Sequence, residues 1–324
     1  MGTVILGTGS YLPQKIVTND DLARLVDTSD EWIRTRTGIS ARHVCGQDEQ
    51  ACNLATTAAR RALDAAGVAA EEIGVIIVAT MTSHTLMPST ACLVQKDLGA
   101  ANAFAYDINA ACSGFLFALD LGDKYVQADH ALKVLVIGTE NMSSRLDWSD
   151  RNTCILFGDG AGAAVIGYRE GMPGYLGSKL LSDGRLWDLL YMYAPKSSNP
   201  DIDNQGHPGT CIVMEGREVF KYAVKAMEEA VHGVLAMKGL TLDAVKLFIP
   251  HQANSRILNK LAERLQLPAE KVFVNISEYG NTSAASIPIA LDEAVRSGRI
   301  LRDDLILICS FGGGFTWGAT LIKW

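Results

Sequence analysis

The sequence predicts an α/β fold built from two similar halves, and two observations support this prediction. Short apolar runs alternate with stretches in which apolar residues recur at helical spacing, from one end of the 324-residue chain to the other. In addition, each half closes with the same order of an apolar run, a glycine turn and a second apolar run. We therefore expect one βα unit to be duplicated, with halves at residues 1–170 and 171–324.

The expected strands are short and apolar, as is typical of sheets that are buried on both faces. They are residues 4–7, 75–80, 104–108, 133–137 and 163–166 in the first half, and 175–181, 246–249, 271–274, 305–309 and 319–322 in the second. The clearest helices are residues 54–66, rich in alanine and suited to close packing on a flat surface, and residues 215–238. Residues 193–211 are rich in turn-forming types and predict a long loop.

The internal repeat is clearest near the end of each half. Residues 134–138 precede Phe157-Gly158-Asp159-Gly160, and residues 305–309 precede Phe311-Gly312-Gly313-Gly314. Earlier in each half, a predicted strand leads to a helix that carries a residue suited to catalysis, Cys112 in the first and Asn281 in the second. The identity between the halves is low, so chance similarity of glycine turns is the alternative explanation.

Composition excludes several classes of protein. With 48% hydrophobic and 20% charged residues, the chain has enough apolar side chains for a buried core. The net charge of -7 argues against a nucleic-acid partner, which requires a broad basic surface. The apolar runs are too short to cross a bilayer, and the first residues lack the features of a signal peptide. We expect no membrane partner.

The seven cysteines are scattered, and no two of them are separated by only two residues. This spacing gives no support to a zinc knuckle or a redox pair, so no metal site is expected. An odd number of scattered cysteines is typical of reduced thiols. The sequence therefore predicts a cytoplasmic protein.

Three polar residues follow predicted strands and indicate covalent acyl chemistry. Cys112 lies between the strand at 104–108 and a helical pattern, where a helix N-terminus favours a thiolate. His251 lies at the carboxyl end of another predicted strand, where α/β sheets place their sites. Asn281 precedes a further helical pattern. Taken singly, Cys112 could be a small buried hydrophobic residue and Asn281 a helix cap.

Four motifs together resemble a known family. They are Ala111-Cys112-Ser113-Gly114-Phe115, Pro250-His251-Gln252-Ala253-Asn254, Gly280-Asn281-Thr282-Ser283-Ala284 and Phe311-Gly312-Gly313-Gly314-Phe315-Thr316-Trp317-Gly318. In this order they resemble β-ketoacyl-[acyl-carrier-protein] synthase III, the initiating condensing enzyme of bacterial type II fatty-acid synthesis, in the thiolase superfamily. The resemblance covers essentially the whole chain. It implies a thiolase-like five-layer αβαβα fold, usually as a homodimer, and no cofactor, since acyl-CoA is a substrate.

The resemblance also implies the reaction and its catalytic residues. The thiolate of Cys112 would take the acyl group of an acyl-CoA primer, with the amides of Cys112 and Gly313 as an oxyanion hole. Malonyl-acyl-carrier-protein would then lose carbon dioxide. Its enolate, held by hydrogen bonds from His251 and Asn281, would attack the acyl-cysteine to give a 3-ketoacyl-carrier-protein.

Contacts to the larger parts of the substrates are implied in the same way. Those assigned to CoA are Thr28, Trp32, Arg36, Arg151 and Asn254, with the adenine between Trp32 and Arg151. Those assigned to the carrier protein are Lys221, Gln252, Ala253, Asn254, Ser255 and Arg256. Independently of the resemblance, Arg256, Lys260 and Arg264 recur every four residues and predict a basic stripe on a helix, which is most often a solvated face.

Met87 occupies the place of a phenylalanine that closes the acyl pocket, from the partner subunit, in acetyl-selective members. Methionine is flexible and unbranched, so the length and branching of the primer stay open. Other readings also stay open, namely a condensing enzyme of secondary metabolism, a cysteine acyl hydrolase and a carrier-binding module. A dinucleotide-binding enzyme is disfavoured because Gly7-Thr8-Gly9 leads into Tyr11 rather than into a helix.

Overall fold

The computed structural model describes residues 2–199, 201 and 209–324, and it contains two large sheets. The first has the order β1 (Gly2–Tyr11), β7 (Asp159–Arg169), β6 (Lys133–Asn141), β4 (Ile73–Ala79) and β5 (Phe104–Ile108). The second has the order β11 (Leu247–Pro250), β12 (Leu305–Gly312), β13 (Thr316–Lys323) and β8 (Tyr175–Ser182). Each sheet draws its strands from one side of the turn between Arg169 and Tyr175.

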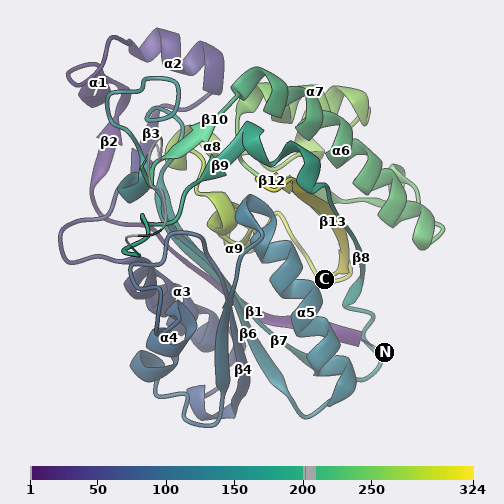
Figure 1. Cartoon of the computed structure of the whole chain (residues 1–324). Helices are drawn as coiled ribbons and strands as arrows, with labels where there is room; N and C mark the ends of the chain where they lie inside the picture. Colours follow the sequence, from purple (N-terminus) through teal and green to yellow (C-terminus); the bar gives the residue numbers. More distant parts are fainter. Residues whose placement is uncertain (1, 200, 202–208) are drawn as a thin grey trace.

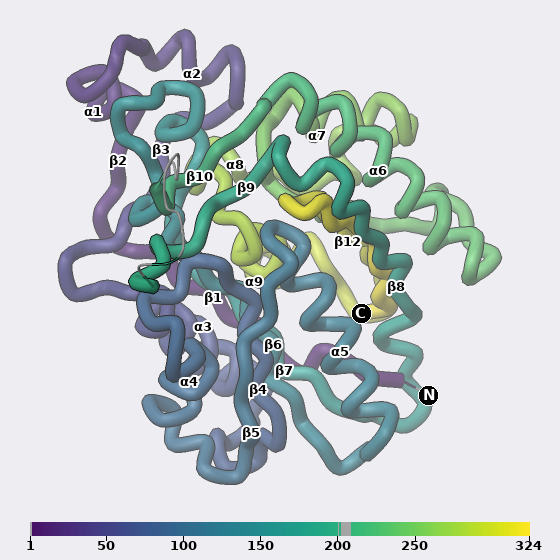
Figure 2. The backbone as a smooth tube through the Cα atoms, in the orientation of Figure 1, coloured from purple at the N-terminus to yellow at the C-terminus, as the bar shows by residue number. Residues whose placement is uncertain are grey.

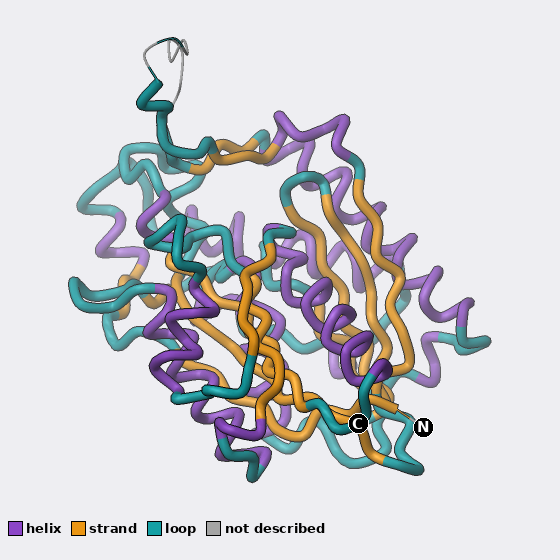
Figure 3. The backbone as a smooth tube through the Cα atoms, turned by 60° about the horizontal axis from the view of Figure 1, so that its bottom comes forward, coloured by secondary structure: helices purple, strands orange, loops and turns teal. Residues whose placement is uncertain are grey.

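Helices and sheets form five layers, which confirms the predicted αβαβα fold (Figure 1). The helices α3 (Ala51–Ala66) and α4 (Thr90–Leu98) cover the outer face of the first sheet. On the outer face of the second lie α6 (Gly216–Met237) and α7 (Ser255–Arg264). The central layer is α5 (Gly114–Ala128) and α9 (Ser286–Arg296), whose apolar residues share one core with both sheets. Figure 3 shows strands with helices between and outside them.

The alanine-rich helix packs on the flat strand β1, as expected. A Cβ atom built on Gly9 would lie 2.4 Å from the carbonyl oxygen of Ala58 and from the amide nitrogen of Ala62, both in α3. A larger residue at Gly9 would collide with the helix backbone. Strand β1 and helix α3 therefore pack backbone against backbone at this point.

The two halves have the same topology. In each, an antiparallel outer strand is followed by a helix, a parallel strand, a second helix, a central helix and a closing hairpin. The prediction of a strand at 271–274 was wrong, because only Val272 forms a single parallel bridge, to Phe248. This bridge occupies the place that β5 has in the first sheet, so the repeat is complete in topology but not in strand length.

Smaller elements form a cap over the carboxyl ends of the parallel strands. They include α1 (Asn19–Leu22), α2 (Asp30–Thr37), the ribbon of β2 (Ile16–Thr18) with β3 (Ala41–His43), α8 (Ile276–Tyr279), and the ribbon of β9 (Leu190–Met192) with β10 (Ile212–Met214). The predicted loop at 193–211 joins β9 to β10, with residues 200 and 202–208 outside the described residues. The tube in Figure 2 shows α1 and α2 at the top left and the two chain ends near each other on the right. Within the described ranges, none of the helices combines the length and apolar character needed to span a membrane.

Candidate active site

Cys112 lies in a tight turn between β5 and the central helix α5. The turn is the short 3-10 segment η2 (Ala111–Ser113), and Ala111 enters it with a φ of 46°, in the left-handed region. A non-glycine residue adopts such a φ only where its surroundings impose it. Here the second half imposes it, since Ser310 Oγ donates to the carbonyl of Cys112 over 2.9 Å and Thr316 Oγ1 donates to that of Ala110 over 2.8 Å.

The end of β12 approaches the turn of Cys112 so closely that Gly312 leaves no room for a Cβ atom. A Cβ atom on Gly312 would lie 2.7 Å from the amide nitrogen of Cys112. The next residue, Gly313, lies against Ala111 and Leu190, and it lines the same cavity as Cys112. Cys112 and Gly313 therefore line the same cavity although they come from different halves of the chain.

Burial dominates the electrostatics of the thiol. The side chain of Cys112 is 7% exposed, and desolvation raises its pKa to about 12. A hydrogen bond with the Ser283 side chain lowers that pKa, and the nearby Glu140 carboxylate raises it. The first helical residues of α5 supply the partial positive charge of a helix N-terminus.

His251 follows β11 directly, and Ser286 at the start of α9 fixes its ring. Ser286 Oγ lies 2.8 Å from His251 Nδ1 and accepts the amide proton of Gln252 over 2.9 Å. The Ser286 hydroxyl has one proton, and among the described residues Nδ1 is the acceptor within its reach, so this proton is directed to Nδ1 and Nε2 carries the ring proton. Burial lowers the pKa of His251 to about 3. The ring is thus neutral at pH 7 and presents an N–H donor.

Asn281 is held on both sides by the segment that precedes β7. Its amide donates to the carbonyl of Leu156 over 2.8 Å, and its carbonyl accepts from Gly158 over 3.1 Å. Its Oδ1 accepts the backbone N–H of Ser283 over 2.8 Å. A backbone N–H can only donate, so this contact identifies the oxygen and leaves Nδ2 as a donor for the cavity.

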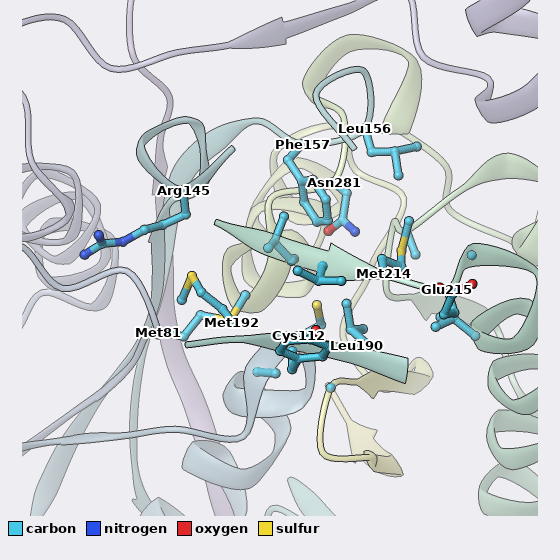
Figure 4. A pocket seen from close by; sticks show the side chains of 18 of the residues that line it. Met81, Cys112, Arg145, Leu156, Phe157, Leu190, Met192, Met214, Glu215 and Asn281 are labelled. Carbon is cyan, nitrogen blue, oxygen red and sulfur yellow. The ribbon is translucent and has the colours of Figure 1, made fainter. Parts of the chain in front are cut away.

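Cys112, His251 and Asn281 all line one cavity of about 2090 Å³. Figure 4 shows Cys112 and Asn281 on its wall, with the side chains of Met81, Met192 and Met214 nearby. The cavity therefore joins a thiol, two neutral hydrogen-bond donors and an adaptable apolar wall. This set fits the formation of an acyl-cysteine and the stabilisation of an oxyanion.

Known proteins with the same sequence pattern cover the whole chain. The family described as 3-oxoacyl-[acyl-carrier-protein (ACP)] synthase III matches residues 106–184, and the model of its C-terminal part matches residues 235–324. A β-ketoacyl-[acyl-carrier-protein] synthase III of Desulfotalea psychrophila is 59% identical over 324 residues, which is 100% of both chains. The chain belongs to the β-ketoacyl-[acyl-carrier-protein] synthase III family.

Solved structures agree with this membership. The chain is 51% identical in sequence to a 3-oxoacyl-[acyl-carrier-protein] synthase III from Aquifex aeolicus VF5, whose crystal structure superposes with a TM-score of 0.93. The match covers 100% of both chains. The priming β-ketosynthase of the R1128 polyketide pathway is 37% identical with a TM-score of 0.93, over 99% of this chain and 96% of that one. As a β-ketoacyl-[acyl-carrier-protein] synthase III, the protein is a condensing acyltransferase that initiates fatty-acid synthesis.

The residues expected to contact CoA in this synthase lie at the cap end of the cavity. Trp32, Arg36 and Asn254 line it, while Thr28 and Arg151 lie just outside the lining. The guanidinium carbons of Arg36 and Arg151 are 4.3 and 5.0 Å from the centre of the Trp32 ring. Arg151 also donates to the carbonyl of Asp27 over 2.7 Å. The space between Trp32 and Arg151 is closed, so an adenine ring enters it only if Arg151 moves.

The residues assigned to the carrier protein are not equally accessible. Gln252 is 1% exposed, and its amide group bonds the backbone of Pro250, Phe273 and Asn275. It therefore shapes the site from inside and does not face a partner. Ala253 and Ser255 are half-buried, and Asn254 caps α7 by accepting from the amide of Arg256 over 2.9 Å.

The basic stripe is partly neutralised by neighbouring carboxylates. Lys260 pairs with Glu263, Arg264 with Glu228, and Lys221 with Glu218. Arg256 and Arg217 are exposed and line the cavity, and neither forms an ion pair within the described residues. In that part of the chain, these two arginines are therefore unpaired cations that the second half places at the cavity.

Met87 does not line the cavity of its own chain. It is 87% exposed on the loop between β4 and α4, whereas its neighbour Leu86 is one of the lining residues. A side chain in this position reaches an acyl pocket only by contact with another molecule.

Sequence reasoning missed three residues that support the site from behind. Ser286 fixes the histidine ring, and Glu140 and Ser283 lie next to the thiol. Ser and Glu in apolar runs are a weak local signal, since such residues are usually found at helix caps and on surfaces. Their positions at the site depend on tertiary contacts between segments that are far apart in the sequence.

Proposed function

We propose that Cys112 accepts the acyl group of acyl-CoA, and that the amides of Cys112 and Gly313 hold the oxyanion of the tetrahedral intermediate. A Cβ atom on Gly312 would lie 2.7 Å from the amide nitrogen of Cys112. The segment that carries the Gly313 amide is thus packed against the turn of Cys112, which supports this assignment. Two backbone donors fixed by opposite halves of the chain cannot reorganise as charge develops, which is the condition for strong oxyanion stabilisation.

In the second step, His251 Nε2 and Asn281 Nδ2 donate to the thioester oxygen of the malonyl group as carbon dioxide leaves. The developing enolate is negative, so the donors must be neutral or positive. The hydrogen bonds of Ser286 and Ser283 orient both donors toward the cavity. This orientation is the observation that carries the assignment, because a reversed amide or the other imidazole tautomer would present a lone pair to the enolate.

CoA and the carrier protein bind at the two ends of the same cavity. CoA lies along Trp32 and Arg36 at the cap, and the acidic carrier protein docks against Arg217 and Arg256 at the entrance. Met81, Met192 and Met214 form an adaptable wall, so primers include branched and medium-length acyl groups besides acetyl. The seven cysteines are all free thiols, which supports a cytoplasmic location.

The working unit is a homodimer formed through β5. Among the described residues only β4 pairs with this strand, so its outer backbone groups face away from the sheet. Phe104 is 49% exposed at the start of β5, and Leu86 and Met87, in the loop that follows the neighbouring strand β4, are both 87% exposed. Pairing with a second copy would cover these apolar side chains and bring Met87 to the partner's acyl pocket.

Sedimentation of Phe104→Lys tests the dimer. We expect the wild type to sediment as a dimer and the variant as a monomer. The control is Leu301→Lys, which changes an equally apolar residue that is 62% exposed away from β5, and it should stay dimeric. A monomeric wild type would reject the dimer.

A primer panel tests the reaction itself. Acetyl-, isobutyryl- and octanoyl-CoA are each mixed with the protein, and intact mass measures acyl transfer to Cys112. Malonyl-acyl-carrier-protein is then added, and carbon dioxide and 3-ketoacyl product are measured. Free acid without 3-ketoacyl product would indicate a hydrolase, and product from acetyl-CoA alone would reject the wider primer range.

The second candidate function is a role in secondary metabolism, which is supported by the similarity to the priming ketosynthase of a polyketide pathway. A strong preference for non-acetyl primers would favour it.

A further inference from the structure

Glu140 is a buried carboxyl group that the mechanism above does not use. It lies at the end of β6 with no exposed surface. One carboxyl oxygen, Oε2, accepts from Thr80 Oγ1, from the amide of Met81 and from Thr82 Oγ1. The other, Oε1, accepts from Ser283 Oγ over 3.2 Å. A carboxyl group buried among neutral donors alone is costly to maintain, so its retention calls for a chemical reason.

Ser283 connects this carboxyl group to the nucleophile. Its hydroxyl donates to Glu140 and also acts on the Cys112 thiol as a hydrogen-bond partner. Its backbone amide binds Asn281 Oδ1, and its φ of 50° is in the left-handed region. Ser283 is therefore held by its backbone, in the turn η7 that packs against η2, and its hydroxyl neighbours both the thiol and Glu140.

The first step requires a proton acceptor that the catalytic histidine does not provide. Attack by Cys112 needs a thiolate, and the thiol proton must go to another group. On His251, Nδ1 receives the Ser286 proton and Nε2 already carries a hydrogen. The imidazole therefore has no lone pair facing the cavity, and its role as a donor to the enolate requires that it keep this tautomer.

We propose that Glu140 accepts the proton of Cys112 through the Ser283 hydroxyl, which makes Glu140 a general base for primer loading. The thiol gives its proton to Ser283 Oγ as the Ser283 proton passes to Oε1, so negative charge moves from carboxylate to sulfur. When the sulfur–carbon bond forms and the thioester bond of CoA breaks, the same proton returns by this path to the departing CoA thiolate. The buried site never changes its net charge, which avoids the cost of creating a new ion there.

The charged and titratable groups around Glu140 are consistent with this role. Cys112 on η2 is the titratable group on which Glu140 acts. On β7, Asp159 lies opposite Asn141, but Ser143 and the amide of Cys45 occupy its oxygens. The loop after β4 contributes Thr80 and Thr82, and η7 (Ser283–Ala285) contributes Ser283. Burial raises the pKa of Glu140 to about 7, so the carboxyl group can take and return a proton near neutral pH.

This inference rests on the proposed acyl transfer to Cys112, and Glu140→Gln tests it. Acyl loading from acyl-CoA is followed by quenched intact mass between pH 5.5 and 9. The wild type should load more slowly as pH falls through about 7, because Glu140 then loses its capacity to accept a proton. In Glu140→Gln this dependence should vanish and loading at pH 7.5 should fall on the order of 10²-fold.

Whether Glu140→Gln slows or speeds acyl loading shows whether Glu140 acts as a base. Because the Glu140 carboxylate raises the pKa of Cys112, its removal from a site without proton transfer would make the thiolate easier to form. Faster or unchanged loading in Glu140→Gln would therefore overturn the proposal. A wild type that takes up no acyl group at all would instead reject the proposed function.

Two further variants exclude a purely structural effect. Ser283→Ala removes the connecting hydroxyl, and it should slow loading as much as Glu140→Gln does. In a Cys112→Ala background, Glu140→Gln should leave decarboxylation of malonyl-acyl-carrier-protein within a few-fold, since His251 and Asn281 are intact. Normal loading by Ser283→Ala, or an equal loss of decarboxylation, would each overturn the relay. The control Glu49→Gln alters a carboxylate that binds Tyr11 and Gly46 far from the site, and it should change neither rate.

Discussion

The two halves of the molecule contain the same turn, at residues 109–114 and 281–286, and use it for different chemistry. Asn109 Oδ1 accepts the amide of Ala111 over 3.1 Å, just as Asn281 Oδ1 accepts that of Ser283. Ala111 and Ser283 both have a positive φ, of 46° and 50°, and a 3-10 turn then leads into a central helix in each half. When the two turns are aligned in this way, Cys112 is equivalent to Ala284. The residue equivalent to Asn281 is Asn109, not Cys112.

In the proposed mechanism the two equivalent turns have separate roles. The first turn carries the proposed nucleophile, and the second carries a proposed enolate donor and the hydroxyl next to the thiol. The turns lie back to back, since Gly138 on β6 packs against the carbonyl of Ala284 and Gly312 on β12 against the amide of Cys112. Each half therefore shapes the turn of the other, and neither half contains a complete site.

The largest effect is expected from making the first turn resemble the second. Cys112→Ala should lower 3-ketoacyl formation roughly 10⁴- to 10⁶-fold, as loss of a covalent nucleophile does. Decarboxylation of malonyl-acyl-carrier-protein should persist. The half-exposed Cys92→Ala is the control for thiol removal and should condense normally. Condensation that survives Cys112→Ala would end the assignment of the nucleophile.

Removing the donor of the second turn should have the converse effect. Asn281→Ala deletes Nδ2 and should reduce decarboxylation about 10²- to 10³-fold, by analogy with the loss of one oxyanion donor. Acyl loading of Cys112 should change little. In the matched variant Asn109→Ala, the same loop bond is lost on the other side, and loading rather than decarboxylation should suffer. Equal losses in both steps for both variants would contradict the division of labour between the turns.

A smaller effect should appear in stability, because only the second half buries a histidine beside its turn. Burial lowers the folded-state pKa of His251 from 6.5 to about 3, so the unfolded chain binds the proton first as pH falls. Stability is therefore lost below pH 6.5, by roughly 1–2 kcal/mol between pH 6.5 and 5. Urea unfolding of the wild type and of His251→Gln measures this. The loss should be absent in the variant, and identical pH slopes would contradict the burial of a neutral ring.

The smallest effect concerns Arg256, a cation that the second half places at the cavity. Arg256→Glu should raise the KM for malonyl-acyl-carrier-protein several-fold and reduce its salt dependence, while loading from acyl-CoA persists. Lys260→Glu on the same helix is the control, since Lys260 already pairs with Glu263. If both variants have the same KM as the wild type, docking at Arg256 is rejected.

Most of the architecture followed from local patterns, and so did the turn that carries Cys112. Apolar runs located all nine strands of the two large sheets in the described part of the chain, and the helix after Cys112 begins where the sequence indicated. The predicted strand at 271–274 was wrong because a short apolar run has no partner along most of its length there, and periodicity alone cannot show what lies beside it. Gln252 shows the same limit, since its position in a motif did not reveal that its amide group is used internally.

The sequence by itself predicted the βα alternation and a duplication from local patterns, and it marked Cys112, His251 and Asn281 as candidates through their places after strands and their motifs. The tertiary structure decided which nitrogen of His251 and which atom of Asn281 face the cavity, and that Glu140 and Ser283 lie behind the thiol. Such facts depend on hydrogen bonds between segments far apart in the chain. A one-dimensional pattern carries no information on them, because the direction of a proton is fixed only when donor and acceptor meet.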